Sequence, residues 1–266
     1  MIRVIVNGDS LAVLGGMGDG SVDMCLTSPP YWGLRDYGVE GQLGLESSPD
    51  LYIERMTEVF HEVKRALKDA GTLWLNIGDT YSANRTYQVK QTRCPDESSM
   101  GMVAPDNVPP KCLCMIPERL AWSLIEDGWI LRNKIVWYKP NGMPSSVRDR
   151  FSNKYEFIYL FAKQQKYYFD LDAVREPHQQ EWGSRDRTNM KNRQIVDYGK
   201  SALTNESQNP LGKNPGDVFQ IPTQPFPEAH FAVFPEKLCE KPIKAGCPLE
   251  VCRKCGKSRE KKFETM

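Results

Sequence analysis

The chain has 266 residues and a formal net charge of +1, and 40% of its residues are hydrophobic and 10% aromatic. This composition excludes a chain that is disordered throughout, and the near-zero net charge means that any nucleic-acid site must be local. The apolar run at residues 1–6 is too short and too soon interrupted for a signal peptide, and no apolar run approaches the roughly 20 residues that span a bilayer. We therefore expect a soluble cytoplasmic protein of one large domain, or one domain with an appendage.

Helical and strand-like patterns alternate through the first 173 residues. Apolar residues spaced three or four apart, with Ser48 as the cap and Pro49 in the first turn, make residues 49–68 the clearest helix. A first strand is expected to lead into a helix cap at residues 7–10. The predicted strands are 2–6, 22–27, 71–77, 129–137 and 155–161, and the predicted helices are 49–68 and 117–128. This alternation indicates an α/β sheet with crossover connections.

Basic residues gather in one part of the chain. Residues 132–154 hold six basic side chains against the single carboxylate of Asp149, a local charge of +5. Such a cluster is typical either of a nucleic-acid surface or of a solvated face, and charge alone leaves both open. The six are Arg132, Lys134, Lys139, Arg148, Arg150 and Lys154.

The run Thr27-Ser28-Pro29-Pro30-Tyr31-Trp32 follows directly on the predicted strand 22–27. In open α/β sheets, ligands bind beyond the carboxyl ends of the strands, which is where this run falls. Two prolines restrict its backbone. Ser28 and the carbonyl of Pro29 can accept the two hydrogens of an amino group while Tyr31 stacks on a flat ring. The alternative is an ordinary turn whose aromatic residues cover the edge of the sheet.

This run resembles the catalytic motif of S-adenosylmethionine-dependent DNA methyltransferases that modify exocyclic amino groups. Residues 7–11, 128–132, 137–141, 156–161 and 229–247 are also similar to that family, in the arrangement where the catalytic half precedes the cofactor half. The resemblance implies a Rossmann-like methyltransferase sheet with helices on both faces, in which residues 1–173 form the catalytic α/β part. It also implies direct methyl transfer to a base flipped out of double-stranded DNA.

The same resemblance implies roles for the residues of the turn. Ser28 and the Pro29 carbonyl would hold the target amino group, Pro30 would help fix the turn, and Tyr31 and Trp32 would stack on the base. A serine before the prolines favours cytosine at N4, with adenine at N6 as the alternative. No Pro-Cys dipeptide, the mark of ring-carbon cytosine methylation in related enzymes, occurs in the chain.

Residues 174–227 are polar, with few apolar runs, and occupy the place of the family's target-recognition segment. Their side chains are of the types that contact phosphates and base edges, although a solvated insertion would have a similar composition. The candidates for binding DNA are Arg185, Arg187, Lys191 and Arg193, and further residues of the same kind are Arg175, Asn189, Asn192 and Gln194. The recognition sequence cannot be read from them.

Residues 228–248 resemble the motif that packs against S-adenosylmethionine. The resemblance implies that Asp9 and residues of this motif approach the cofactor, namely His230, Phe231, Phe234, Pro235 and Glu236. The family continues from here into a glycine-rich cofactor loop, and no Phe-x-Gly-x-Gly sequence occurs in the chain. We therefore expect either a truncated chain or a separate C-terminal half, and an open sheet edge that favours a homodimer.

The tail, residues 249–266, resembles part of a zinc ribbon. Cys252 and Cys255 have the spacing of one zinc knuckle, but a structural zinc site needs four ligands, and a pair of free thiols is the alternative. Two other classes of function stay open for the whole chain. One is a DNA-binding module without activity, and the other is a methyltransferase that acts on RNA or protein.

Overall fold

The computed structural model describes residues 4–82, 108–178, 209–226, 233–252 and 254–256. The chain divides into two compact units: one comprises residues 1–169 and 217–266, and the other residues 170–216. These limits lie close to the predicted start of the recognition segment at residue 174, and its predicted role stays a prediction. In the smaller unit, Arg175 binds the Asp172 carboxylate (2.7 Å) and the Gly212 carbonyl (3.0 Å). Asp172 belongs to a short 3₁₀ helix, Asp172–Val174.

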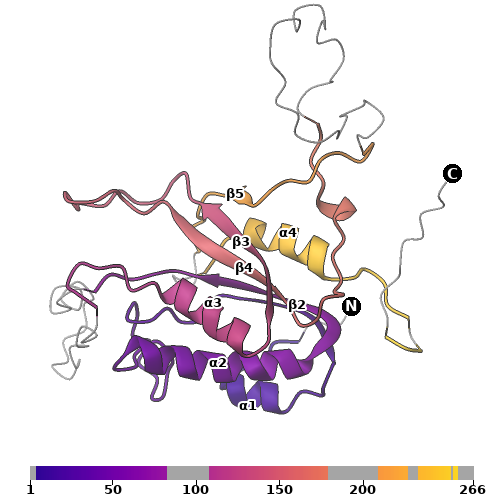
Figure 1. Cartoon of the computed structure of the whole chain (residues 1–266), viewed down its shortest axis with the longest axis horizontal. Helices are drawn as coiled ribbons and strands as arrows, with labels where there is room; N and C mark the ends of the chain where they lie inside the picture. Colours follow the sequence, from indigo (N-terminus) through magenta and orange to yellow (C-terminus); the bar gives the residue numbers. More distant parts are fainter. Residues whose placement is uncertain (1–3, 83–107, 179–208, 227–232, 253, 257–266) are drawn as a thin grey trace, which may run out of the picture. The chain divides into compact units, whose positions relative to one another are not determined.

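The described part of the larger unit is built on a five-stranded sheet with the order β1-β2-β4-β3-β5 (Figure 1). β1 runs parallel to β2, and β3 parallel to β5, while β4 is antiparallel to both of its neighbours. The strands are β1 (Val22–Thr27), β2 (Leu67–Ile77), β3 (Ile130–Tyr138), β4 (Tyr155–Ala162) and β5 (Val218–Gln220).

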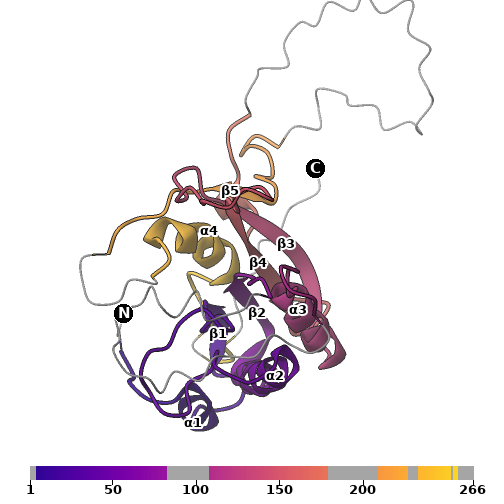
Figure 2. The same ribbon diagram turned by 90° about the vertical axis from the view of Figure 1, so that its left-hand side faces the viewer.

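Helices cover both faces of this sheet, as the resemblance implied. α2 and α3 pack together on one face, α1 lies against α2, and α4 packs on β1 and β2 from the opposite face (Figures 1 and 2). The helices are α1 (Ser10–Gly15), α2 (Pro49–Ala66), α3 (Ile116–Glu126) and α4 (Glu236–Gly246). No helix in the described part of the chain is both long and apolar enough to cross a membrane.

The amphipathic pattern of α2 creates much of the core. Ser48 caps the helix by accepting a hydrogen bond from the Leu51 amide (3.2 Å), and Pro49 occupies the first turn, where its missing N–H is not needed. One face of α2 is buried against the sheet and α3, and each large apolar side chain on it contributes about 1.5–3 kcal/mol. The buried residues are Pro49, Tyr52, Ile53, Met56, Phe60, Val63 and Ala66.

Strand register places three chain segments at one end of the sheet. Thr27 at the end of β1 pairs with Leu75 in β2, and Ile77 at the end of β2 pairs with Phe157 near the start of β4. The residues that follow β1, those that end β2 and those that begin β4 are therefore neighbours. Asp79, just beyond β2, accepts hydrogen bonds from the amides of Met115 and Ile116 and so fixes the start of α3 at the same end.

Most predicted elements are confirmed, with shifts at their boundaries. β1 has the predicted limits, and α2 ends two residues early because Leu67 turns extended and begins β2. The strand predicted at residues 2–6 is wrong for its described part. Residues 4–6 form no strand, and the side chains of Val4, Ile5 and Val6 are 72%, 98% and 59% exposed.

Candidate active site

The Ser-Pro-Pro-Tyr turn leaves the end of β1 and is held from behind by α2 and the loop before it. The Tyr52 hydroxyl of α2 donates to the carbonyl of Pro30 (2.8 Å), and the Trp32 ring nitrogen donates to the carbonyl of Glu46 (3.0 Å). The amide of Gly33 donates to the carbonyl of Gly44 (2.7 Å). The turn is therefore fastened on both sides of Tyr31.

The Tyr31 hydroxyl lies at the centre of a polar cluster drawn from all three segments. It accepts a hydrogen bond from the Ser28 hydroxyl (3.2 Å) and can donate to Glu156 Oε2 (2.9 Å) or to Asn76 Oδ1 (3.2 Å). Burial, reinforced by the negative charge of Glu156, raises the pKa of Tyr31 well above its ordinary value. The phenol consequently stays protonated at neutral pH and acts as a donor to the carboxylate.

The cluster is closed by two further contacts. The Lys139 ammonium binds Glu156 Oε1, and the Asn76 amide nitrogen donates to the carbonyl of Phe157 (3.0 Å) and to Glu156 Oε2 (3.3 Å). Asn76 is 2% exposed, and its amide is satisfied by these bonds. The Glu156 carboxylate thus holds a phenol, an amide and an ammonium in one arrangement.

Sequence reasoning did not select Asn76, Glu156, Lys139 or Tyr52 as site residues. Asn76 is a polar residue inside an otherwise apolar strand, and Glu156 is a charge at the start of another. A buried polar residue in an apolar strand is the signal that could have found them, because such a group needs a partner. Their meeting with Tyr31 depends on strand order and register.

Two glycines allow the aromatic ring of Tyr31 to lie where it does. A Cβ atom on Gly78, directly after β2, would fall 2.6 Å from Tyr31 Cε2. A Cβ atom on Gly44 would fall 3.0 Å from the Tyr31 carbonyl oxygen, and Gly44 has φ +98°. Gly78 therefore provides the space for the ring, and Gly44 the space for the backbone of the turn.

Trp32 does not share the exposure of its neighbour. It is 1% exposed and belongs to the hydrophobic core, whereas Tyr31 is half-buried. A ring with 1% exposure has no open face for a base, so the expected stacking role of Trp32 is corrected to a structural one.

The carbonyl oxygen of Pro29 is available as an acceptor, because no donor in the described part of the chain is bonded to it.

The residues expected on the cofactor side are only partly described. Asp9 is the N-cap of α1, where its Oδ1 accepts from the Ala12 amide (2.9 Å), and it is exposed. Phe234 is half-buried, Pro235 is buried as the N-cap residue of α4, and Glu236 is exposed in the first turn of that helix. His230 and Phe231 lie outside the described residues.

Of the expected recognition and metal-binding residues, few are described. Arg185, Arg187, Asn189, Lys191, Asn192, Arg193 and Gln194 all lie outside the described residues. Cys252 and Cys255 are exposed, and no group of three or more His, Cys, Asp or Glu that could hold a metal occurs among the described residues. The described residues therefore offer no zinc site around this pair.

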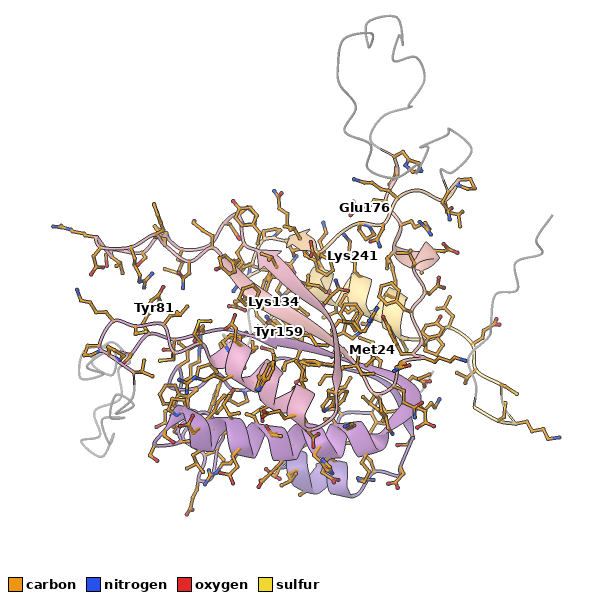
Figure 3. All side chains as sticks on the ribbon, in the orientation of Figure 1. Met24, Tyr81, Lys134, Tyr159, Glu176 and Lys241 are labelled. Carbon is orange, nitrogen blue, oxygen red and sulfur yellow. The ribbon has the colours of Figure 1, made fainter. Side chains whose placement is uncertain are left out.

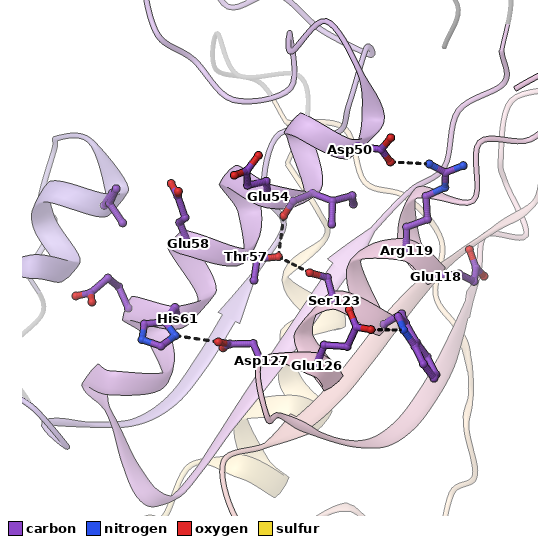
Figure 4. Close-up of a pocket in the computed structure, with 14 residues that line it drawn as sticks. Asp50, Glu54, Thr57, Glu58, His61, Glu118, Arg119, Ser123, Glu126 and Asp127 are labelled. Carbon is purple, nitrogen blue, oxygen red and sulfur yellow. Dashed lines mark hydrogen bonds and ion pairs between the residues drawn. The ribbon is translucent and has the colours of Figure 1, made fainter. Parts of the chain in front are cut away.

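A cavity of about 1150 Å³ lies between α2 and α3 and is separate from this turn (Figure 4). Its carboxylates outnumber its cations, and several are already engaged, such as Asp50 with Arg119 and Asp127 with His61. An acidic surface repels DNA phosphates, so we do not assign the nucleic-acid site to this face. Its acidic residues are Asp50, Glu54, Glu58, Glu62, Glu118, Glu126 and Asp127.

A mixed sheet with helices on both faces, and a Ser-Pro-Pro-Tyr turn beyond its strand ends, defines a Rossmann-like methyltransferase. A family model described as DNA methylase matches residues 22–250. The chain belongs to this DNA methylase family.

Individual relatives agree with this assignment. The chain is 42% identical to the Type II methyltransferase M.Cfr9I of Citrobacter freundii over 236 residues, which are 88% of this chain and 69% of the relative. It is 42% identical to M.XycI of Xanthomonas campestris pv. cyanopsidis, covering 91% of this chain and 71% of that protein, and 39% identical to M.SmaI of Serratia marcescens, covering 91% and 74%. The solved structure of the PvuII DNA methyltransferase, described as cytosine-N4-specific, shares the fold with a TM-score of 0.55 at 17% identity, covering 90% of this chain and 68% of that one.

Proposed function

We propose that this protein transfers the methyl group of S-adenosylmethionine to the exocyclic N4 amino group of cytosine in double-stranded DNA. The observation that carries the proposal is the direction of one hydrogen bond. The Ser28 hydroxyl gives its hydrogen to Tyr31, so the lone pairs of Ser28 Oγ remain available to accept a hydrogen from an amino group. The carbonyl of Pro29, to which no donor among the described residues is bonded, supplies the second acceptor.

Two acceptors on one rigid turn suit an amino group attached to a flat base. When both amine hydrogens are bound, the nitrogen lone pair is directed out of the base plane and away from the protein acceptors. Tyr31 would stack on the base, worth about 1–3 kcal/mol, and Asn76 and Glu156 keep its phenol in place through the hydroxyl. Positioning of this kind is a large part of catalysis when no covalent intermediate is needed.

The cofactor site is proposed from the resemblance of Asp9 and residues 228–248 to the family's cofactor-side segments and from the chemistry of their side chains. Phe234 offers an apolar ring that suits the adenine, and the exposed carboxylates of Glu236 and Asp9 suit ribose hydroxyls. Pro235 is proposed to contact the cofactor as well, together with His230 and Phe231, which lie outside the described residues. When bound, S-adenosylmethionine would supply an electrophilic methyl group on a sulfonium sulfur.

Cytosine is preferred to adenine on the identity of the residue before the prolines. Ser28, the residue before the two prolines, provides one neutral acceptor. By the resemblance to the family, a serine at this position favours cytosine, whereas an aspartate or asparagine would favour adenine. Adenine at N6 is the second candidate, because the same two acceptors would also bind its amino group. The remaining alternatives are an inactive DNA-binding protein and a methyltransferase of RNA or protein.

The test compares Ser28→Ala with Ser21→Ala, a matched change at an exposed serine. Tritiated methyl transfer from S-adenosylmethionine to unmethylated plasmid DNA should fall about 10- to 100-fold in Ser28→Ala, since one acceptor of the amino group is lost. Cofactor affinity, measured by calorimetry, should be the same in both variants. Equal transfer rates in the two variants would show that Ser28 does not hold the target.

A further inference from the structure

The connection between β3 and β4 forms an exposed arm, residues 139–154, that projects beyond the end of the sheet (Figure 1). Its base is closed by the hydrogen bond from the Lys139 amide to the Lys154 carbonyl (2.7 Å), and Lys154 Nζ binds the Gly142 carbonyl (2.7 Å). Every residue from 143 to 151 is exposed. The Phe151 side chain is 97% exposed, so this large aromatic ring on the arm contributes nothing to the core.

The arm carries positive charge beside this ring. Its one acidic residue, Asp149, is bound by Lys111 (2.8 Å), which lies in another loop. The Arg150 guanidinium lies over the ring of Tyr81, 4.0 Å from its centroid, and Tyr81 can be found in Figure 3 in the loop that follows β2. Arg148 has no hydrogen bond or ion pair with any residue that the structure describes. The arm is thus braced against a neighbouring loop and presents an unneutralised guanidinium.

The base of the arm is part of the candidate active site. Lys139, its first residue, binds the same Glu156 carboxylate that accepts from the Tyr31 hydroxyl. A duplex that delivers a base to Tyr31 therefore comes close to the base of the arm. The charge of the arm is also complementary to DNA, whereas the α2–α3 face is acidic.

We propose that the arm is a duplex-DNA contact in which Arg148 and Arg150 bind backbone phosphates and Phe151 enters the base stack where the flipped base has left. This inference rests on the proposed function, because only base flipping creates such a gap. Apolar side chains that enter base steps are an established way for proteins to stabilise distorted DNA. Here the ring buries its exposed surface and restores stacking to the bases on either side of the gap.

The experiment measures binding of the protein to fluorescently labelled duplexes by anisotropy, at several salt concentrations. One duplex is intact, and the other has a single abasic nucleotide that mimics the gap. Wild-type protein should prefer the abasic duplex by about 5- to 150-fold, the range that corresponds to one base–aromatic stack. Phe151→Ala should lose this preference and keep the salt dependence, while Trp122→Ala, a change at another exposed aromatic residue (63%), should keep both.

The arginines are tested through the salt dependence. Arg148→Ala and Arg150→Ala should each reduce the slope of log affinity against log salt by about 0.9, the value for one lost phosphate contact. Lys166→Ala is the matched control, because Lys166 is exposed and lies beyond the other end of β4, roughly 25 Å along that strand from the arm. The substituted side chains are exposed, so thermal unfolding should change little in these variants, with the largest effect in Arg150→Ala, which loses the contact with Tyr81.

The two ways of failing are distinct. If the wild-type protein binds neither duplex, the proposed function is refuted and this inference falls with it. If the wild type binds DNA but Phe151→Ala behaves like Trp122→Ala and the arginine variants behave like Lys166→Ala, the arm has no role in binding and the proposed function is unaffected.

Discussion

Gly78→Ala tests whether the position of the Tyr31 ring matters for methyl transfer. The new Cβ atom would lie 2.6 Å from Tyr31 Cε2, and ordinary contact begins at 3.4 Å, so the ring edge has to retreat by about 0.8 Å. Its hydroxyl cannot then keep all of its contacts with Ser28, Asn76 and Glu156, which are 2.9–3.2 Å long. Misplacement by roughly 1 Å costs about 100-fold in rate, and overpacking costs about 1–3 kcal/mol of stability.

The assay is tritiated methyl transfer under single-turnover conditions, together with urea unfolding. We expect the transfer rate of Gly78→Ala to fall about 100-fold while the protein remains folded. Gly15→Ala is the control, because a Cβ atom there meets nothing within 4 Å. If both variants transfer methyl groups at the wild-type rate, the packing of Tyr31 against Gly78 is not needed for catalysis and the argument from positioning is wrong.

Three further predictions concern the groups around the turn and the thiols. Glu156→Gln should lower the pKa of Tyr31, because the negative charge of Glu156 raises that pKa. Burial is the larger cause, so the pKa should still lie above the ordinary value of 10.0. NMR of ring-labelled tyrosine would measure the pKa, and an unchanged value would show that the charge of Glu156 does not act on Tyr31. Trp32→Ala truncates a core side chain, so it should lower the free energy of unfolding in urea by about 3–5 kcal/mol. A loss below about 1 kcal/mol would show that Trp32 does not have this structural role. Iodoacetamide should label Cys252 faster and at lower pH than Cys25, because the amides of Cys255 and Lys254 lower the pKa of Cys252 and burial raises that of Cys25 to about 12; equal labelling of the native protein, read by peptide mass spectrometry, would contradict this.

Local patterns were enough to predict the parts of the fold that depend on local physics. The apolar spacing of α2, its Ser48 cap and Pro49 give a helix whose limits are nearly those of the structure. The turn from Ser28 to Tyr31 is predictable because a restricted backbone, a hydroxyl and an aromatic ring stand together in the chain. Signals of this kind survive in any tertiary context.

The remaining parts depend on contacts between distant segments. Glu156 reaches Tyr31 only because β4 lies antiparallel to β2, which the sequence pattern does not specify. In the sequence, Trp32 and Tyr31 are equally good candidates for stacking on a base. In the structure, the hydrogen bond from the Trp32 ring nitrogen to the Glu46 carbonyl directs the Trp32 side chain into the core. The residues from Val4 to Val6 have strand-forming side chains, and a β-branched run forms a strand only where a partner strand is available.

We propose above all that the Ser28 turn holds the N4 amino group of cytosine. Mass spectrometry of nucleosides from DNA that the protein has methylated with S-adenosylmethionine tests it most directly. We predict N4-methylcytosine as the product. N6-methyladenine as the sole methylated nucleoside would contradict the claim and assign the same turn to adenine.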